Sequence, residues 1–174
     1  MGRLPRLIPA LWLATLPVAA ASGDLELRNW FDDPFFQVRT AVLACPTPLG
    51  PLTDEAEMRK QTHSRSERGT RCWLAGQCRL PSSYLYDAGI AAAVRARFEA
   101  TRTLRDASLW VTVQRRIVWV EGCVARAPGS TAIDKLLRGI PDIELVVVNV
   151  LRAAGAAPPY RTLDSAQAAP PRRP

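Results

Sequence analysis

Four cysteines and a single histidine are the residues of this chain that could do chemistry. They are Cys45, Cys72, Cys78, Cys123 and His63. An even set of cysteines is typical of a disulfide framework in an exported chain, and four cysteines allow three connectivities. A zinc site needs four closely spaced ligands, and no two of these cysteines are separated by only two residues. We therefore expect disulfides and no metal site.

Groups that could act in catalysis are sparse. A nucleophilic cysteine needs a neighbouring base, and His63 lies in a polar segment where a histidine is usually just solvated. Asp32 and Asp33 are adjacent, so their side chains diverge, and a turn explains them better than paired catalytic carboxylates. The sequence shows no phosphate-binding glycine loop and no Ser/His/Asp set. These observations predict a protein that is not an enzyme and has no cofactor.

Residues 1–21 are typical of a secretory signal peptide. Arg3 and Arg6 precede an uncharged apolar run over residues 7–21, which ends in an Ala-x-Ala cleavage site. The run is too short to span a membrane, and the alternative of a buried N-terminal helix fits its charged start poorly. We therefore expect a mature chain that begins near Ser22 in the periplasm, where disulfides persist.

The charge balance points to anionic partners. The net charge of the 174 residues is +7, and the predicted signal peptide accounts for two of the arginines. Such a basic charge can attract anionic membrane surfaces or nucleic acid, or it can have no particular partner. Aromatic residues that could stack on bases do not alternate with the basic positions, so we expect no binding of nucleic acid.

The segment from residue 87 to residue 152 carries the pattern of a folded core. Ile90, Val94 and Phe98 recur every four residues, which predicts an amphipathic helix with Asp87 as its N-cap. Residues 108–124 then alternate with a period of two, which predicts a β-hairpin. One face of the hairpin carries Leu109, Val111, Val113, Val118, Val120 and Gly122, and the other carries Trp110, Thr112, Ile117, Trp119 and Cys123.

The turn of this hairpin has an unusual sequence. A two-residue turn prefers Asn-Gly or Asp-Gly because both residues need a positive φ, and Arg115-Arg116 fits that preference badly. A four-residue loop of the same parity is the alternative. A second helix follows, capped by Ser130 or Thr131 and closed by Gly139, and an aliphatic strand over residues 143–151 completes the pattern.

The predicted fold is an α/β sandwich with the order α-β-β-α-β over residues 84–152. Two helices cover one face of a three-stranded mixed sheet. Residues 22–83 form an irregular extension that contains cysteines and a short helix from Asp54 to about His63, capped by Thr53. Residues 153–174 are rich in Ala, Pro and Arg and are expected to be a disordered tail.

This pattern resembles the BON domain family (bacterial OsmY and nodulation domain). The matching motifs are Val111-x-Val113, Val118-x-Val120-x-Gly122-x-Val124 and Ile140-Pro141-x-Ile143-x-x-Val146. They mark the fold more than an activity. The family usually has a glycine in the hairpin, where Arg115-Arg116 stands, and another at the position of Asp142.

The resemblance implies a non-enzymatic role at the periplasmic side of the envelope. Relatives are associated with phospholipid surfaces, envelope integrity and osmotic stress, so the implied partner is an anionic phospholipid membrane surface. Candidate contacts are the basic residues around the first helix, Arg95, Arg97, Arg102 and Arg105, unless they merely solvate it. The alternative is a protein–protein adaptor in an envelope assembly, with the extension as the docking surface. The oligomeric state and the trigger stay open.

The second face of the sheet predicts a cover and a pairing of the cysteines. Exposed Trp110 and Trp119 would form an apolar patch that soluble monomers rarely leave bare. The extension has the anchors for a cover, namely Trp30, Phe35, Phe36 and Trp73. A short Cys72–Cys78 loop would leave Cys45 to pair with Cys123 and pin the cover in place. The alternative is a free Cys123, with a second copy of the chain over this face.

Overall fold

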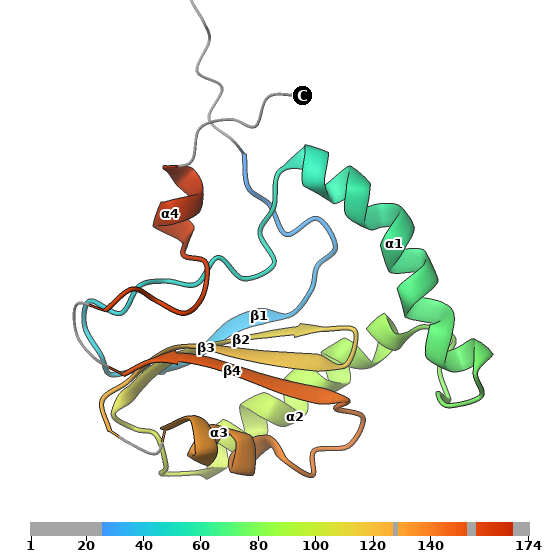
Figure 1. The fold of residues 1–174 in the computed structure, drawn as a ribbon. Helices are drawn as coiled ribbons and strands as arrows, with labels where there is room; N and C mark the ends of the chain where they lie inside the picture. Colours follow the sequence, from blue (N-terminus) through green and yellow to red (C-terminus); the bar gives the residue numbers. More distant parts are fainter. Residues whose placement is uncertain (1–25, 127–128, 153–155, 169–174) are drawn as a thin grey trace, which may run out of the picture.

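The computed structural model describes residues 26–126, 129–152 and 156–168, which form four strands and four helices around one sheet (Figure 1). The predicted signal peptide at residues 1–21 lies outside the described residues. None of the described helices has the length and apolar character needed to cross a membrane. The elements are β1 (Phe35–Thr40), α1 (Glu55–Leu74), the 3-10 helix η1 (Ser83–Tyr86), α2 (Asp87–Ala100), β2 (Ala107–Gln114), β3 (Ile117–Val124), α3 (Gly129–Leu137), β4 (Leu145–Leu151) and α4 (Leu163–Gln167).

The sheet is mixed and has the order β1-β2-β3-β4. β2 pairs antiparallel with β1 and β3, and β4 runs parallel to β3. The mixed α/β class is as predicted, but the expectation of three strands is wrong because the extension supplies β1. Phe36 of β1 pairs with Val111 of β2, and its side chain is buried in the hydrophobic core that contains Val111. Arg39 then fastens β1 to the end of α2 by donating to the carbonyl oxygens of Phe98 (2.5 Å) and Thr101 (3.0 Å).

The inner face of the sheet is closed by α2 and α3, which lie side by side below it (Figure 1). Val94 and Phe98 of α2 and Ile133 and Leu137 of α3 are at most 1% exposed. The hairpin residues predicted for this face are buried to the same degree: Leu109, Val111, Val113, Val118 and Val120 are each 0% exposed. Burial of aliphatic side chains on this scale is the main source of stability in a domain of this size.

The hairpin turn is a two-residue turn in spite of its sequence. Gln114 pairs with Ile117, and Arg115 and Arg116 have φ values of 55° and 65°. Their backbone amides both donate to the carboxyl group of Asp87, at 2.7 Å each. Asp87 is therefore not the N-cap that the sequence predicted; that position belongs to Tyr86, which has no side-chain cap. The carboxyl group offsets the steric cost of two left-handed residues.

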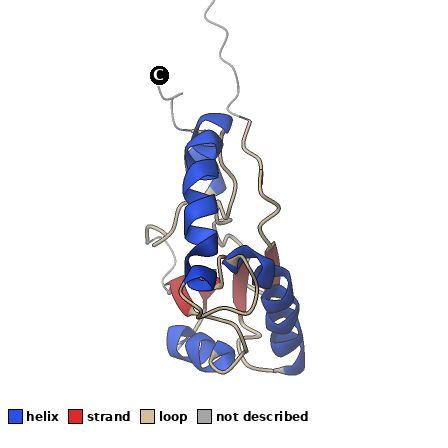
Figure 2. Ribbon diagram, turned by 90° about the vertical axis from the view of Figure 1, so that its right-hand side faces the viewer, coloured by secondary structure: helices blue, strands red, loops and turns tan. Residues whose placement is uncertain are grey.

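The helix predicted from Asp54 to about His63 is twice as long as expected and is capped by a residue other than Thr53. α1 runs to Leu74, and the carboxylate of Asp54, not the hydroxyl of Thr53, accepts the amide of Glu57 at 2.7 Å. Only Gly69 of α1 is buried, so hydrophobic packing does not explain the helix. It begins above the outer face of the sheet and descends along one end of it towards α2 (Figures 1 and 2).

One buried ion pair holds the middle of α1. Arg65 donates to both carboxylate oxygens of Asp33, at 2.9 and 2.6 Å. Its guanidinium lies 4.0 Å from the ring centroids of both Phe31 and Tyr84. Gln114 of β2 donates to the same carboxylate at 2.6 Å. A carboxylate predicted only to form a turn therefore links the extension, α1 and the sheet.

Part of the predicted disordered tail is ordered. Residues 156–168 return along the extension and end in α4. Tyr160 and Thr162 are each 9% exposed. The Tyr160 hydroxyl donates to the carbonyl oxygen of Pro46 at 2.9 Å, and Thr162 forms a bridge with Pro48. These contacts with a distant part of the chain, not a local pattern, order the segment. Residues 153–155 and 169–174 lie outside the described residues.

Candidate functional site

Both predicted disulfides are present. Cys45 is bonded to Cys123 over a separation of 78 residues, with an S–S distance of 2.07 Å, and Cys72 to Cys78 over 6 residues, at 2.02 Å. The pairing derived from the face pattern is thus confirmed, and the alternative of a free Cys123 is wrong. The Cys45–Cys123 bond links the extension covalently to the outer face of the sheet, and the Cys72–Cys78 bond closes a short loop at the end of α1.

The outer face of the sheet is covered in part, as expected, but by more than the extension. Trp110 and Trp119 are half-buried. Trp30 is held over this side by its indole N–H, which donates to the carbonyl oxygen of Thr53 at 2.7 Å. The tail also contributes, because the Tyr160 hydroxyl lies 4.0 Å from Cys123 Sγ.

Two of the four predicted anchors do not lie on the outer face. Phe36 faces inward and belongs to the core under the helices. Trp73 lies at the end of α1 and is 46% exposed. Phe35 does pack beside Gly50 of the extension, where a β-carbon would meet its ring at 2.7 Å. The cover therefore rests on Trp30, Phe35 and Tyr160.

This cover leaves a half-open groove of about 980 Å³ between the sheet and the extension. β2 and β3 form its floor through Thr112, Gln114, Trp119 and Glu121. The wall is made by the chain before β1, the loop between β1 and α1, the first turns of α1, and the tail: Glu26, Leu27, Trp30, residues 49–57, Lys60, Gln61 and Arg161. Five separate segments of the chain thus meet around one hollow.

Glu121 is the acid on the floor of this groove. Burial raises the pKa of its carboxyl group, and a hydrogen bond from the side chain of Asn149 on β4 opposes this shift. Burial, and secondly the charge of Glu121, also raise the pKa of Tyr160 to about 12. The outer face is therefore a place where negative charge is poorly solvated, which favours the approach of a cation.

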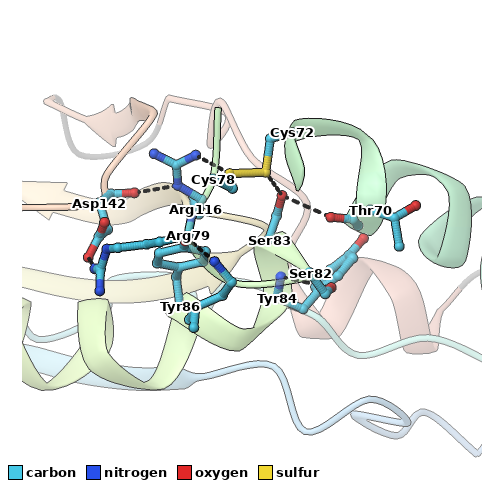
Figure 3. The surroundings of a disulfide bond; sticks show 12 residues. Thr70, Cys72, Cys78, Arg79, Ser82, Ser83, Tyr84, Tyr86, Arg116 and Asp142 are labelled. Atoms are coloured by element: carbon cyan, nitrogen blue, oxygen red, sulfur yellow. Dashed lines mark hydrogen bonds and ion pairs between the residues drawn. A yellow bond between two sulfur atoms is a disulfide. The ribbon is translucent and has the colours of Figure 1, made fainter. Parts of the chain in front are cut away.

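The second disulfide sits in a dense polar corner (Figure 3). The Tyr86 hydroxyl accepts the backbone amides of Arg79 and Leu80, each at 2.8 Å. Arg116 donates through Nε to the carbonyl oxygen of Asp142 at 2.8 Å and lies 3.1 Å from Cys78 Sγ. These contacts tie the loop to η1, to the hairpin turn and to the segment before β4.

From this corner an apolar loop projects into solvent. We call residues 68–79 the disulfide tip. Trp73 is 46% exposed, Leu74 is 79% exposed, and residues 75–77 are also exposed. The tip contains Arg68, Arg71 and Arg79 and no acidic residue. Arg68 and Arg71 are exposed on the last turns of α1, next to the apolar pair.

All four arginines predicted to contact lipid are exposed, and two of them also have contacts within the domain. Arg95 lies over the Phe36 ring, 3.4 Å from its centroid, and Arg97 reaches the carbonyl oxygen of Leu136 on α3 at 3.5 Å. Arg102 and Arg105 are exposed beyond the end of α2. The arginines of the disulfide tip were not singled out from the sequence. Arginines on both sides of a Cys-Trp-Leu loop are the signal that could have found them.

Neither surface carries metal-binding or thiol chemistry in the part of the chain that the structure describes. No group of three or more His, Cys, Asp or Glu side chains there could hold a metal ion. His63 is exposed and lies 3.3 Å from Glu67, one turn along α1. All four cysteines are in disulfides.

Comparisons of the chain with protein-family models, with curated proteins and with solved structures find no match.

Proposed function

We propose that this protein is an exported, non-enzymatic binding module that docks on an anionic membrane surface through the disulfide tip. The observation that carries the proposal is the exposed pair Trp73 and Leu74, held at the end of a helix and flanked in the sequence by Arg68, Arg71 and Arg79, of which Arg79 is paired with Asp142. An indole and an aliphatic side chain favour the interface of a bilayer, and arginine favours its anionic headgroups.

The BON resemblance supports the same proposal. The order α2, β2, β3, α3, β4 over residues 87–151 is the order that the resemblance implied. Arg115, Arg116 and Asp142 stand where the family usually has glycine, and their φ values are 55°, 65° and 67°. A conformation that favours glycine at those positions is what a diverged member of the family would retain. A role at the envelope is what that resemblance implies.

The rigidity of the disulfide tip lowers the entropic cost of binding to a membrane. The Cys72–Cys78 bond and the anchored Arg79 fix the apolar pair before it meets a membrane, so less conformational entropy is lost on contact. Each arginine near an anionic surface contributes about 1 kcal/mol. Two exposed arginines and two apolar side chains give reversible attachment, not insertion.

Sedimentation with vesicles tests this proposal. The mature chain from Ser22 is expected to sediment with vesicles that contain phosphatidylglycerol and not with pure phosphatidylcholine, and high salt should weaken the binding. The double variant Trp73→Gln/Leu74→Gln should lose binding. Leu43→Gln is the matched control, because Leu43 is 91% exposed but lies far along the chain from the tip.

Two further double variants compare the disulfide tip with the arginines around α2 as the membrane contact. Arg68→Gln/Arg71→Gln should weaken binding roughly 30-fold, from about 1 kcal/mol for each charge. Arg102→Gln/Arg105→Gln should have a smaller effect. The opposite ranking, or unchanged binding by a folded Trp73→Gln/Leu74→Gln protein, would refute the tip as the membrane contact.

A further inference from the structure

The groove over the outer face has a composition of its own. Its lining includes five carboxylates, those of Glu26, Asp54, Glu55, Glu57 and Glu121, and two cations, those of Lys60 and Arg161. The whole chain, by contrast, carries a net charge of +7. This local composition favours a cationic ligand over an anionic one in the groove.

Glu121 differs from the other acids of the groove because it neither forms an ion pair with a described residue nor caps a helix. Glu26 pairs with Arg28 and Glu55 with Arg59, and Glu57 lies 3.8 Å from Lys60. Asp54 caps α1. Glu121, on the floor of the groove, forms no ion pair with any residue that the structure describes. A cation entering the groove would therefore meet a half-buried carboxylate without a competing positive charge on it.

Two indoles supply the apolar part of the site. Trp119 lies on the floor beside Glu121, and Trp30 lies in the wall. The Trp30 ring also has the Arg28 guanidinium of this chain 5.4 Å from its centroid. Leu27, Leu49 and Leu52 complete the apolar lining. Carboxylates and apolar surfaces that line one groove match a ligand that carries both cationic and apolar side chains.

We infer that this groove binds an extended basic peptide segment of a partner protein, with an arginine or lysine directed at Glu121 and apolar side chains against Trp30 and Trp119. The groove is half open and is walled by several segments, which suits a length of chain more than an enclosed small molecule. The inference does not depend on the proposed docking at a membrane, since the disulfide tip contributes no residue to the groove.

Fluorescence anisotropy with a labelled peptide tests the inference. The probe is an alternating Arg-Leu octapeptide, and an alternating Glu-Leu octapeptide is its control. The mature chain should bind the basic peptide and not the acidic one. Glu121→Gln, which keeps the shape of the side chain, should weaken binding roughly tenfold, whereas Glu67→Gln, outside the groove on α1, should leave it unchanged. Lys60→Glu should strengthen binding several-fold.

The site of binding is checked independently of these variants. In the ¹⁵N-labelled mature chain the basic peptide should shift the indole N–H signals of Trp30 and Trp119 and leave that of Trp73 in place. No binding, equal binding of both peptides, or unchanged affinity of Glu121→Gln would overturn the inference. A shift confined to Trp73 would overturn it as well, because the peptide would then lie on the disulfide tip. Failure of the vesicle experiment would leave it standing.

Discussion

The two faces of the sheet are built by different means. The inner face is closed by α2 and α3, which are neighbours of β2 and β3 in the sequence, and the aliphatic side chains that β2 and β3 contribute to it are fully buried. The outer face is covered by the extension and the tail, which come from both ends of the chain and are stapled by the Cys45–Cys123 bond. It retains a half-buried acid, two half-buried indoles and a groove of about 980 Å³.

This difference separates stability from recognition. The helix-covered core of β2 and β3 is packed without room for a ligand, and its apolar side chains stabilise the domain. A face held by a covalent bond does not need dense packing, so polar and aromatic groups can remain accessible on it. The same division applies at the end of α1, where the Cys72–Cys78 bond holds an apolar loop in solvent that packing alone would not keep there.

The largest effect on stability is expected from a carboxylate introduced on the inner face of the sheet. Glu121 is tolerated on the outer face, but Val120→Asp places a carboxyl group among fully buried aliphatic side chains and should prevent folding. The matched variant Trp119→Asp faces the groove and should still fold. Circular dichroism and thermal unfolding measure both. A cooperative native transition in Val120→Asp would break the comparison.

Removal of the long-range disulfide should come next. Cys45→Ser/Cys123→Ser releases a constraint over 78 residues, which the chain-entropy model values at about 4 kcal/mol of unfolding free energy. Cys72→Ser/Cys78→Ser should cost about 2 kcal/mol in the same model, because its loop is short. Urea unfolding measures both. The first variant should also make Trp119 more accessible to acrylamide, and equal costs for the two variants would contradict this ranking.

The fastening of α2 to the hairpin is tested by Asp87→Ala. The variant loses two hydrogen bonds to the amides of Arg115 and Arg116, and the expected loss of stability is about 2 kcal/mol. Burial raises the pKa of the Asp87 carboxyl group, while the two amide bonds oppose that shift. The amide exchange rates of Arg115 and Arg116 should rise in the variant. Unchanged exchange would show that the carboxyl group does not hold the turn.

A smaller, stabilising effect is expected from the turn itself. Arg115→Gly relieves a left-handed conformation and should raise the unfolding free energy by about 1 kcal/mol. Arg116→Gly is the contrasting variant, because Arg116 also contacts Asp142 and lies 5.1 Å from the Tyr86 ring centroid, and those contacts would be lost. Chemical denaturation should therefore rank Arg115→Gly above wild type and Arg116→Gly below Arg115→Gly.

The smallest effect is a pH dependence on the outer face. Burial raises the pKa of Glu121 in the folded state above its ordinary 4.5, so the folded protein binds this proton more tightly than the unfolded chain. The associated stability is present below pH 4.5 and is lost as the pH rises through the folded-state pKa. Glu121→Gln should thus be more stable than wild type at pH 7, and the difference should shrink at pH 4. A pH-independent difference in melting temperature would contradict this origin.

The periodic part of the fold was predictable from the sequence. Residues 107–124 and the helix residues Ile90, Val94 and Phe98 carry patterns with a period of two or of about four, and these patterns depend only on neighbours along the chain. The same alternation placed Cys123 on the outer face, which led to its pairing with Cys45. Elements and faces of this kind follow from local sequence because side-chain direction is fixed by the backbone repeat.

Long-range contacts decided the rest. Arg65 of α1 pairs with Asp33 of the extension, and Tyr160 of the tail donates to the carbonyl oxygen of Pro46. The sequence determined the composition of the helix-covered core and of the disulfides. The groove, the exposed disulfide tip and the role of Asp87 were decided only by the tertiary structure, because each joins residues that no periodic pattern connects.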